Sequence, residues 1–283
     1  MEIRKQETLK QYTTVRIGGV ADRFYVPESR EELTCLLNEL KGEDVRILSG
    51  GSNLLIDDER IFPHVIYMKN CSQELTYKGD GVFYCGASVR LQQLIQFANS
   101  KGYGGIEYLM SVPGMVGGAV VMNAGRGKSY NKAISDHIVS VEVWQDGSIR
   151  TLSKEECVFS YRNSVFKNSG MVILAVLFRF SQDEMEVLEK RRNKRLEYSR
   201  HRQDSEGFNF GSVFFNYSSG AMKLIRRFRL CHSGEIAFSG KTLNWLVNKG
   251  DGTFKQAVKV IRRAACINRL FGIKAELEVI IWK

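Results

Sequence analysis

The stretch SVPGMVGGAVVMNAG, at residues 111–125, decides how the rest of the chain is interpreted. Four glycines and a proline interrupt a segment that is otherwise largely apolar. Glycine permits positive φ angles and lets another group approach the backbone without meeting a Cβ atom. The stretch therefore has two interpretations: a buried turn between core elements, or a loop that holds a ligand against main-chain amides.

A second glycine-rich stretch, ILSGGSNLLIDD at residues 47–58, follows a predicted strand. Main-chain amides in such a turn can form a concave site for an anion, which short polar side chains can complete. The stretch lacks the Gly-Lys-Ser/Thr of a Walker loop and the Gly-x-Gly-x-x-Gly of a dinucleotide fold. By itself it identifies no particular nucleotide.

Length and composition are those of a globular protein. A chain of 283 residues suggests about two domains, and 43% hydrophobic with 25% charged residues is ordinary for a soluble protein. No apolar run of about 18 residues predicts a membrane span, and we expect a cytoplasmic protein. The six cysteines have no short spacing that would indicate a zinc site or a redox pair, so we expect reduced and mostly buried thiols.

The positive charge is concentrated near the C-terminus. Residues 200–283 contain 15 Lys and Arg against 6 Asp and Glu, which accounts for +9 of the formal net charge of +10. An anionic ligand is the simplest explanation. Nucleic acid is the competing one, because EKRRNKRLEYSRHR at 189–202 is strongly basic. That run is also typical of the solvated face of a charged helix, and no nucleic-acid-binding motif accompanies it.

Hydrophobic patterning predicts strands alternating with helices. The predicted strands are 45–48, 64–68, 137–144 and 171–180, and the predicted helices are 91–102, about 182–200 and 253–272. The last helix has Thr253 as N-cap and Gly272 as its stop, with Phe254, Val258, Ile261 and Ala265 on one face. The polar stretch at 202–212 is the expected crossing into a second unit.

Four motifs together resemble the UDP-N-acetylenolpyruvoylglucosamine reductase family. They are YTTVRIGGVADRF at 12–24, LSGGSNLLIDD at 48–58, GIEYLMSVPGMVGGAVVMNAG at 105–125 and YRNSVF at 161–166. Their order and spacing match over nearly the whole chain. The resemblance implies an α+β protein with an FAD-binding fold of the vanillyl-alcohol oxidase type, built from two α+β subdomains and followed by a smaller α+β substrate-binding domain. The implied domains are 1–199, with subdomains of about 1–68 and 69–199, and 200–283.

The resemblance favours the second interpretation of the stretch at 111–125, a loop that holds a ligand. It implies noncovalently bound FAD, with the pyrophosphate on the first glycine-rich stretch and the flavin against the second. The implied cofactor-binding residues are Gly50, Gly51, Ser52, Asn53, Leu54, Ser111, Val112, Gly114, Gly117, Gly118, Ala119 and Asn123. No metal site is expected.

Three catalytic residues are carried over from the family motifs: Arg162, Ser212 in GSVFFN, and Glu278 in KAELEV. NADPH is the implied hydride donor, and the product is UDP-N-acetylmuramate for peptidoglycan synthesis. Arg162 would stabilise charge on the substrate carboxylate, Glu278 would orient that group, and Ser212 would donate the proton. Without the resemblance, Arg162 is typical of a surface or salt-bridged arginine in a strand-like context, Ser212 of a glycine-serine turn before a strand, and Glu278 of a solvent-facing strand position. Tyr161 and Asn216 are the implied substrate-binding residues.

The C-terminal part departs from the family pattern. Where the family has Lys-Asn-Pro, this chain has Phe215, Asn216 and Tyr217, so a positive charge expected near the substrate diphosphate is missing. Lys223, Arg226 and Arg227 on the next predicted helix are the candidates to replace it. A related enzyme acting on another anionic enol ether therefore stays an alternative, as does a flavin-binding protein without catalysis. We expect a monomeric cytoplasmic oxidoreductase of cell wall biogenesis, and hence of cell shape and division, with a nucleotide-sugar substrate and neither nucleic acid nor membrane as partner.

Overall fold

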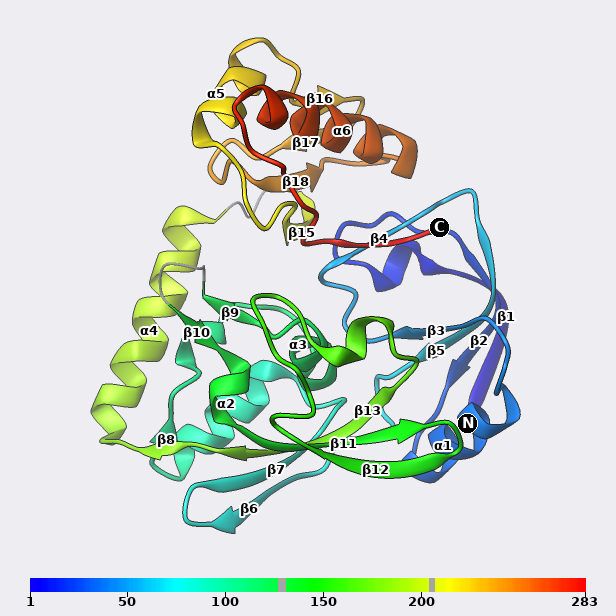
Figure 1. Ribbon diagram of the computed structural model, residues 1–283, viewed down its shortest axis with the longest axis vertical. Helices are drawn as coiled ribbons and strands as arrows, with labels where there is room; N and C mark the ends of the chain where they lie inside the picture. The colour runs from blue at the N-terminus through cyan, green and yellow to red at the C-terminus, as the bar shows by residue number, and fades with distance from the viewer. Residues whose placement is uncertain (127–130, 204–206) are drawn as a thin grey trace. The chain divides into compact units, whose positions relative to one another are not determined.

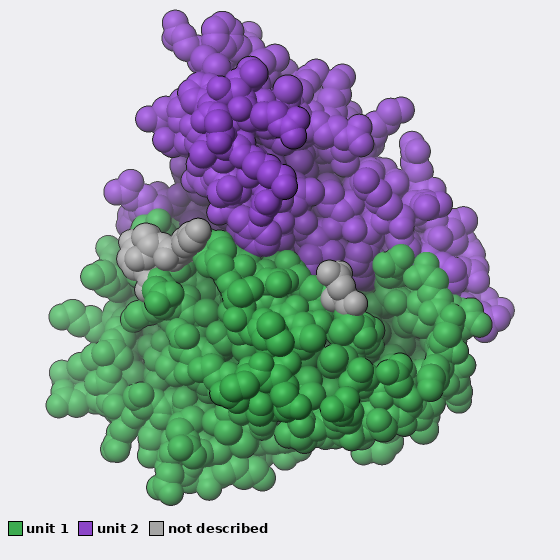
Figure 2. Space-filling view, viewed as in Figure 1, with its two compact units in different colours: residues 1–4, 24–50, 64–199 green, residues 5–23, 51–63, 200–283 purple. Residues whose placement is uncertain are grey.

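A computed structural model describes residues 1–126, 131–203 and 207–283. The chain divides into two compact units, coloured separately in Figure 2. Unit 1 comprises Met1–Arg4, Phe24–Gly50 and His64–Ser199, and unit 2 comprises Lys5–Arg23, Gly51–Pro63 and Arg200–Lys283. Two N-terminal segments thus pack with residues 200–283. The functional division into domains 1–199 and 200–283 stays a prediction, and part of the expected crossing, 204–206, lies outside the described residues.

A five-stranded antiparallel sheet with the order β12-β11-β13-β7-β6 forms the centre of unit 1 (Figure 1). Its strands are β6 (Leu75–Gly79), β7 (Val82–Gly86), β11 (Ile138–Gln145), β12 (Ser148–Ser153) and β13 (Val172–Arg179). The sequence of β13, VILAVLFR, is apolar on both faces because the strand is buried almost throughout. The strands predicted at 137–144 and 171–180 are confirmed.

The first four α-helices of the chain are α1 (Arg30–Glu39), α2 (Leu91–Ser100), α3 (Val116–Val121) and α4 (Met185–Arg202). Helix α2 confirms the helix predicted at 91–102 and buries Leu91, Leu94, Ile95 and Ala98. In the 18-residue α4 only Leu188 is buried. The basic run at 189–202 is therefore a largely solvated helix surface, as its composition indicated.

A second, four-stranded sheet has the order β1-β2-β5-β3. Its strands are β1 (Glu2–Thr8), β2 (Val20–Val26), β3 (Val45–Leu48) and β5 (Ile61–Tyr67). Strands β3 and β5 confirm the strands predicted at 45–48 and 64–68, and they pair in parallel. The remaining short strand pairs are β8 (Tyr103–Gly104) with β14 (Ser181–Gln182), β9 (Gly125–Arg126) with β10 (Lys132–Ala133), and β4 (Leu54–Ile56) with β19 (Ile280–Trp282).

Short 3-10 helices connect several of these elements. They are η1 (Leu9–Tyr12), η2 (Glu107–Leu109), η4 (Ile134–His137) and η5 (Val165–Asn168). The helix η2 leads directly into the glycine-rich stretch at 111–125.

Unit 2 contains a four-stranded sheet with the order β15-β18-β17-β16 and two helices. The elements are β15 (Phe208–Ser212), α5 (Ser219–Arg227), β16 (His232–Ser233), β17 (Ile236–Phe238), β18 (Trp245–Asn248) and α6 (Phe254–Leu270). Thr253 caps α6 as predicted, and Gly272 after it has a φ of 72°. The predicted apolar face contacts the core: Phe254 and Ile261 are buried, and Val258 and Ala265 are partly buried against the same cluster. Ala257, Val260 and Ala264 beside it are buried as well.

Each unit has its own hydrophobic core. In unit 1, Phe83, Phe178 and Leu91 are fully buried, and in unit 2 Val15, Leu55 and Phe214 from three distant segments pack in one cluster. All six cysteines are free; Cys71, Cys85 and Cys157 are buried, Cys231 is half-buried, and Cys35 and Cys266 are exposed. Burial raises the pKa of the Cys157 thiol to about 12, which keeps it protonated. Among the described residues, no helix combines the length and the apolar character needed to cross a membrane.

Candidate active site

The glycine-rich stretch of unit 1 forms a loop that leads into α3. Gly114 has a φ of 136°, a conformation that L-residues with a Cβ rarely adopt. A Cβ atom on Gly50 would lie 3.0 Å from the Cα atom of Gly114. The two glycine-rich stretches therefore approach each other backbone to backbone within unit 1, and a side chain at Gly50 would separate them.

The start of α3 is tied to the chain that follows β7. The amide of Val116 donates to the carbonyl of Val89 (2.8 Å), and the amide of Gly117 donates to the carbonyl of Ala87 (2.9 Å). A Cβ atom on Gly117 would meet the Cβ of Ala87 at 3.0 Å. Gly117 thus permits close packing of α3, while Gly114 supplies the turn before it.

Three hydroxyl groups around this loop indicate that it holds a ligand. The oxygens of Ser49, Tyr108 and Ser111 are buried, and none has a hydrogen-bond partner within the described parts of the chain. Buried polar groups in folded proteins are nearly always paired. A ligand with several oxygens and nitrogens would satisfy them. The residues present therefore fit FAD, with its pyrophosphate and its flat polar ring.

A tight turn carries Tyr161 and Arg162. Ser160 and Asn163 exchange both backbone hydrogen bonds across it, at 3.0 and 3.1 Å, and Arg162 adopts a φ of 55°. The prediction that Arg162 lies in a strand is wrong, because the chain reverses at this point. The guanidinium carbon of Arg162 lies 5.8 Å from the centre of the Tyr161 ring.

The turn is fixed to the end of α3 by two side chains. The buried amide of Asn123 donates to the carbonyl of Ser160 (2.9 Å) and accepts from the amide of Ser135 (3.3 Å). The hydroxyl of Ser164 donates to the carbonyl of Val121 (2.7 Å). The Asn of the glycine-rich signature thus positions the turn that presents Arg162. Its predicted contact with the cofactor stays a prediction.

The positive charge of Arg162 affects the pKa of the Tyr108 phenol. Burial raises the pKa of the Tyr108 phenol, and the carboxylates of Asp136 and Glu107 raise it further, while the positive charge of Arg162 opposes them. The phenol is therefore neutral at physiological pH and can donate a hydrogen bond. Tyr108 and Ser49 were missed by the sequence analysis, although Ser49 directly precedes Gly50 and Tyr108 lies three residues before Ser111.

In unit 2 the backbone places Ser212 and Glu278 on neighbouring segments. Ser212 ends β15, and the chain after it runs antiparallel to residues 276–278. The amide of Glu278 donates to the carbonyl of Val213 (2.8 Å), and the amide of Phe215 donates to the carbonyl of Glu276 (2.9 Å). Both predicted catalytic side chains of this unit are half-buried.

Two asparagines hold the Glu278 segment from either side. The side-chain amide of Asn53 donates to the carbonyl of Glu278 (3.0 Å), and the carbonyl of Asn53 accepts from the amide of Ile280 (3.1 Å). The side-chain oxygen of Asn216 accepts from the amide of Glu276 (3.1 Å). The first glycine-rich stretch therefore also positions the predicted catalytic glutamate.

The backbone conformation and close surroundings of Gly51 in unit 2 also require a glycine at this position. Its φ is 58°, and a Cβ atom there would collide with the carbonyl oxygen of Tyr12. The carbonyl of Gly51 in turn accepts from the amide of Thr14 (3.1 Å). The motif at 12–24 and the Gly-Gly pair thus form one local structure, followed by Ser52, which is half-buried, and by Leu54, which begins β4.

The predicted site residues divide between the two units. Unit 1 carries Gly50, Ser111, Val112, Gly114, Gly117, Gly118, Ala119, Asn123, Tyr161 and Arg162, and unit 2 carries Gly51, Ser52, Asn53, Leu54, Ser212, Asn216 and Glu278. Within each unit the structure brings the predicted catalytic residues together with the backbone that supports them. Their individual roles stay predictions.

A match to a protein-family model shows which class of protein this chain belongs to. Residues 21–153 match the family model of the FAD binding domain. Together with the glycine loops and the unsatisfied hydroxyls, this match defines an α+β protein with an FAD-binding domain.

Full-length relatives identify the family. The chain is 34% identical to the UDP-N-acetylenolpyruvoylglucosamine reductase of Moorella thermoacetica, across 100% of this chain and 94% of the relative. It is 32% identical to reductase 2 of Symbiobacterium thermophilum, across 99% and 92%. The crystal structure of the enzyme from Thermus caldophilus superposes with a TM-score of 0.79 at 29% identity, covering 100% and 98% of the two chains. The chain belongs to the UDP-N-acetylenolpyruvoylglucosamine reductase family.

Proposed function

We propose that the protein reduces the enolpyruvyl group of UDP-N-acetylglucosamine enolpyruvate to give UDP-N-acetylmuramate, with NADPH as the hydride donor. The full-length relationship to reductases of that name supports the proposal, and the observation that carries it is the presence of Arg162, Ser212 and Glu278 on braced backbone segments. We expect it to act as a cytoplasmic monomer.

Bound FAD would supply the hydride-transfer chemistry. Ser49, Tyr108 and Ser111 would satisfy its polar atoms, because their hydroxyls are buried and have no other partner in the described chain. Gly50 and Gly114 let the two glycine-rich backbones lie directly against each other, so that main-chain groups of both stretches could contact the cofactor.

Arg162 would stabilise the negative charge that develops beside the substrate carboxylate. Its guanidinium stays protonated and can hold a carboxylate at two points. The turn that carries it is fixed by Asn123 and Ser164 before substrate binds. Such preorganisation means that little reorganisation is needed as the charge develops.

Ser212 would donate the proton to carbon, and Glu278 would orient the substrate carboxyl group. A serine is a weak acid in water, but it can serve when a strongly basic carbon lies within hydrogen-bond distance. The backbone bonds between 213–215 and 276–278 hold the two residues in a fixed relation. Tyr161 and Asn216 are proposed to contact the substrate.

The oxidation of NADPH by the purified protein tests the proposal. We expect NADPH to be consumed rapidly only when UDP-N-acetylglucosamine enolpyruvate is present, and NADH to be used less well. The absorbance of the reduced nicotinamide reports the rate. Equal consumption with and without the nucleotide sugar would show an oxidase or a non-catalytic flavoprotein instead.

The excess of basic residues predicts the nature of the ligand. If these residues serve a diphosphate-bearing substrate, UDP should raise the Michaelis constant for the nucleotide sugar at modest salt, because it carries the same charged group. Steady-state rates with and without UDP measure this. An unchanged Michaelis constant with UDP, together with strong inhibition by duplex DNA, would favour a nucleic-acid partner.

A further inference from the structure

Large apolar side chains are exposed together on α5, just after it, and at the end of α6. Leu224 is 38% exposed, Phe228 62%, Leu270 80% and Phe271 46%. Single exposed apolar residues are common, but a cluster of this kind marks an interaction surface. We refer to these four side chains as the apolar strip.

The helix geometry places Leu224 and Phe228 on one face of α5. Gly220, Leu224 and Phe228 are spaced four residues apart and therefore share a face of the helix. A Cβ atom on Gly220 would lie 3.2 Å from the ring of Phe271, so the Phe271 ring lies at the N-terminal end of that face. The opposite face of α5 buries Ala221, Met222 and Ile225 in the core of unit 2. Leu224 and Phe228 thus lie on the side of α5 that faces away from that core.

Basic residues are neighbours of the strip along the chain, and the two segments that carry it contain no acidic residue. The sequence at 217–234 contains Lys223, Arg226, Arg227 and Arg229 without any Asp or Glu. The sequence at 252–275 contains Lys255, Lys259, Arg262, Arg263, Arg269 and Lys274, again without an acidic residue. The basic residues next to the strip, Lys223, Arg227, Arg229 and Arg269, are exposed.

We propose that the apolar strip and its basic neighbours dock the protein onto the surface of an anionic phospholipid bilayer. Phe and Leu side chains that project between Lys and Arg are the combination that binds such surfaces, with the apolar groups among the acyl chains and the cations at the lipid phosphates. Nucleic acid would use the basic side chains but not the exposed leucines. Docking at a membrane surface requires no helix that spans the membrane. The proposal departs from our sequence-based expectation that the protein has no membrane partner.

Co-sedimentation of the full-length, FAD-loaded protein with lipid vesicles tests the proposal. We expect binding to vesicles of phosphatidylglycerol mixed with phosphatidylcholine, and little binding to phosphatidylcholine alone. Binding should weaken from about 0.1 M to about 1 M salt, because the screening length falls from about 10 Å to about 3 Å. Failure to bind the anionic vesicles, or equal binding to both kinds, would overturn the proposal.

Two substitutions separate the apolar contribution from simple charge attraction. Phe228→Ser and Leu270→Ser should each weaken vesicle binding by about tenfold, because each removes a large side chain from the apolar phase. Ile61→Ser is the matched control, since Ile61 is 63% exposed in unit 2 outside the strip and its loss should leave binding unchanged. All three sites are exposed, and equal melting temperatures would verify folding.

Two further outcomes would contradict the lipid proposal. If the two strip variants bind as tightly as the control, charge alone causes the binding and the strip has no role in it. If ultracentrifugation without lipid shows self-association that both substitutions abolish, a second copy of the chain covers the strip, and the lipid proposal fails. The salt series on the unmodified protein remains a test even where a variant does not fold.

Discussion

At the scale of single residues, the hydroxyl of Ser212 offers the most direct test of the proposed chemistry. Ser212→Ala should leave FAD content and NADPH-driven flavin reduction nearly unchanged, because neither step uses that hydroxyl. Reoxidation by the nucleotide sugar should slow by about 10²–10⁴-fold, the usual contribution of a general acid. Stopped-flow absorbance with each half-reaction triggered separately measures both rates. Ser219→Ala, at an exposed serine of the same unit, is the control, and wild-type reoxidation in Ser212→Ala would make Ser212 a structural residue.

Arg162 calls for a different substitution, because both charge and shape are proposed to matter. Arg162→Lys keeps the positive charge but loses the two-point grip on a carboxylate. We expect weaker substrate binding and slower turnover, each by about tenfold or more, since a hydrogen bond to a charged group contributes roughly 1.5–3 kcal/mol. Steady-state kinetics separate the two effects. Unchanged constants would indicate that Arg162 meets solvent or protein instead of the substrate.

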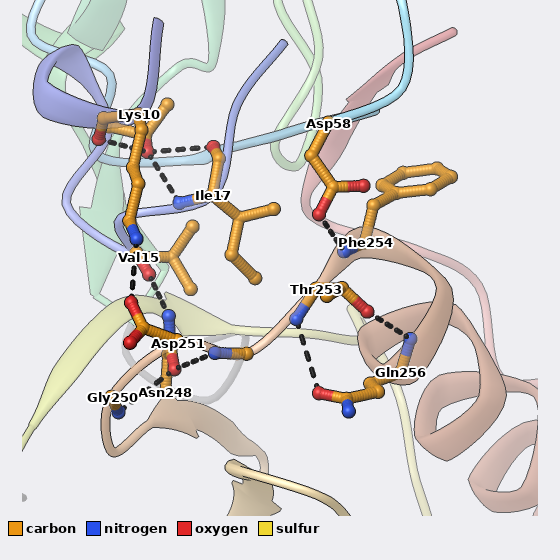
Figure 3. A network of polar contacts seen from close by, with 12 residues as sticks. Lys10, Val15, Ile17, Asp58, Asn248, Gly250, Asp251, Thr253, Phe254 and Gln256 are labelled. Atoms are coloured by element: carbon orange, nitrogen blue, oxygen red, sulfur yellow. Dashed lines mark hydrogen bonds and ion pairs between the residues drawn. The ribbon is translucent and has the colours of Figure 1, made fainter.

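At the scale of elements, the start of α6 depends on a buried asparagine more than on its cap (Figure 3). Asn248 is fully buried; it accepts from the amides of Gly250 (3.1 Å) and Gly252 (3.0 Å) and donates to the carbonyl of Val15 (2.9 Å). Thr253 forms a capping box with Gln256, and the carboxylate of Asp58 accepts from the amide of Phe254 (3.1 Å). One side chain thus connects β18, the loop before α6 and the motif at 12–24.

These contacts predict an order of stability losses. Thr253→Ala should lower the free energy of unfolding by about 1 kcal/mol, the usual cost of a lost cap. Asn248→Ala should cost about 3 kcal/mol or more, because each buried group left unpaired costs roughly 1–3 kcal/mol. Urea unfolding of both variants tests the order. An Asn248→Ala variant no less stable than Thr253→Ala would mean that water replaces the lost bonds.

At the scale of the whole molecule, the cofactor should be held without a covalent bond. Neither SGGSNLL nor SVPGMVGGAVVMNAG contains a histidine or cysteine that could attach it. The purified protein should be yellow, and acid precipitation should release the colour into the supernatant, because unfolding removes the loops that bind it. Flavin absorbance of the pellet and the supernatant measures this. Colour that stays in the pellet would show a covalent link.

Local patterns in the sequence were sufficient for the turns at the glycine-rich stretches, for the four predicted strands, and for Thr253 as the cap of α6. These features depend on residues that are neighbours along the chain. The burial of Val260 and Ala264 in α6 was not predicted, because Val258 and Ala265 are equally apolar and periodicity alone does not say which apolar positions the core covers most completely. The burial of the Tyr108 hydroxyl was also not predicted, because no local sequence pattern indicates it.

The sequence by itself determined the family, the FAD loops and the identity of the three proposed catalytic residues, because these are carried by short motifs. Only the tertiary structure showed why several motif residues are required. Gly51 leaves room for the carbonyl of Tyr12, Asn123 holds the turn of Arg162, and Asn53 holds the segment that carries Glu278. It also showed that residues 5–23 and 51–63 pack with the C-terminal unit. Each of these facts depends on backbone groups that are far apart in sequence and meet only when the chain is folded.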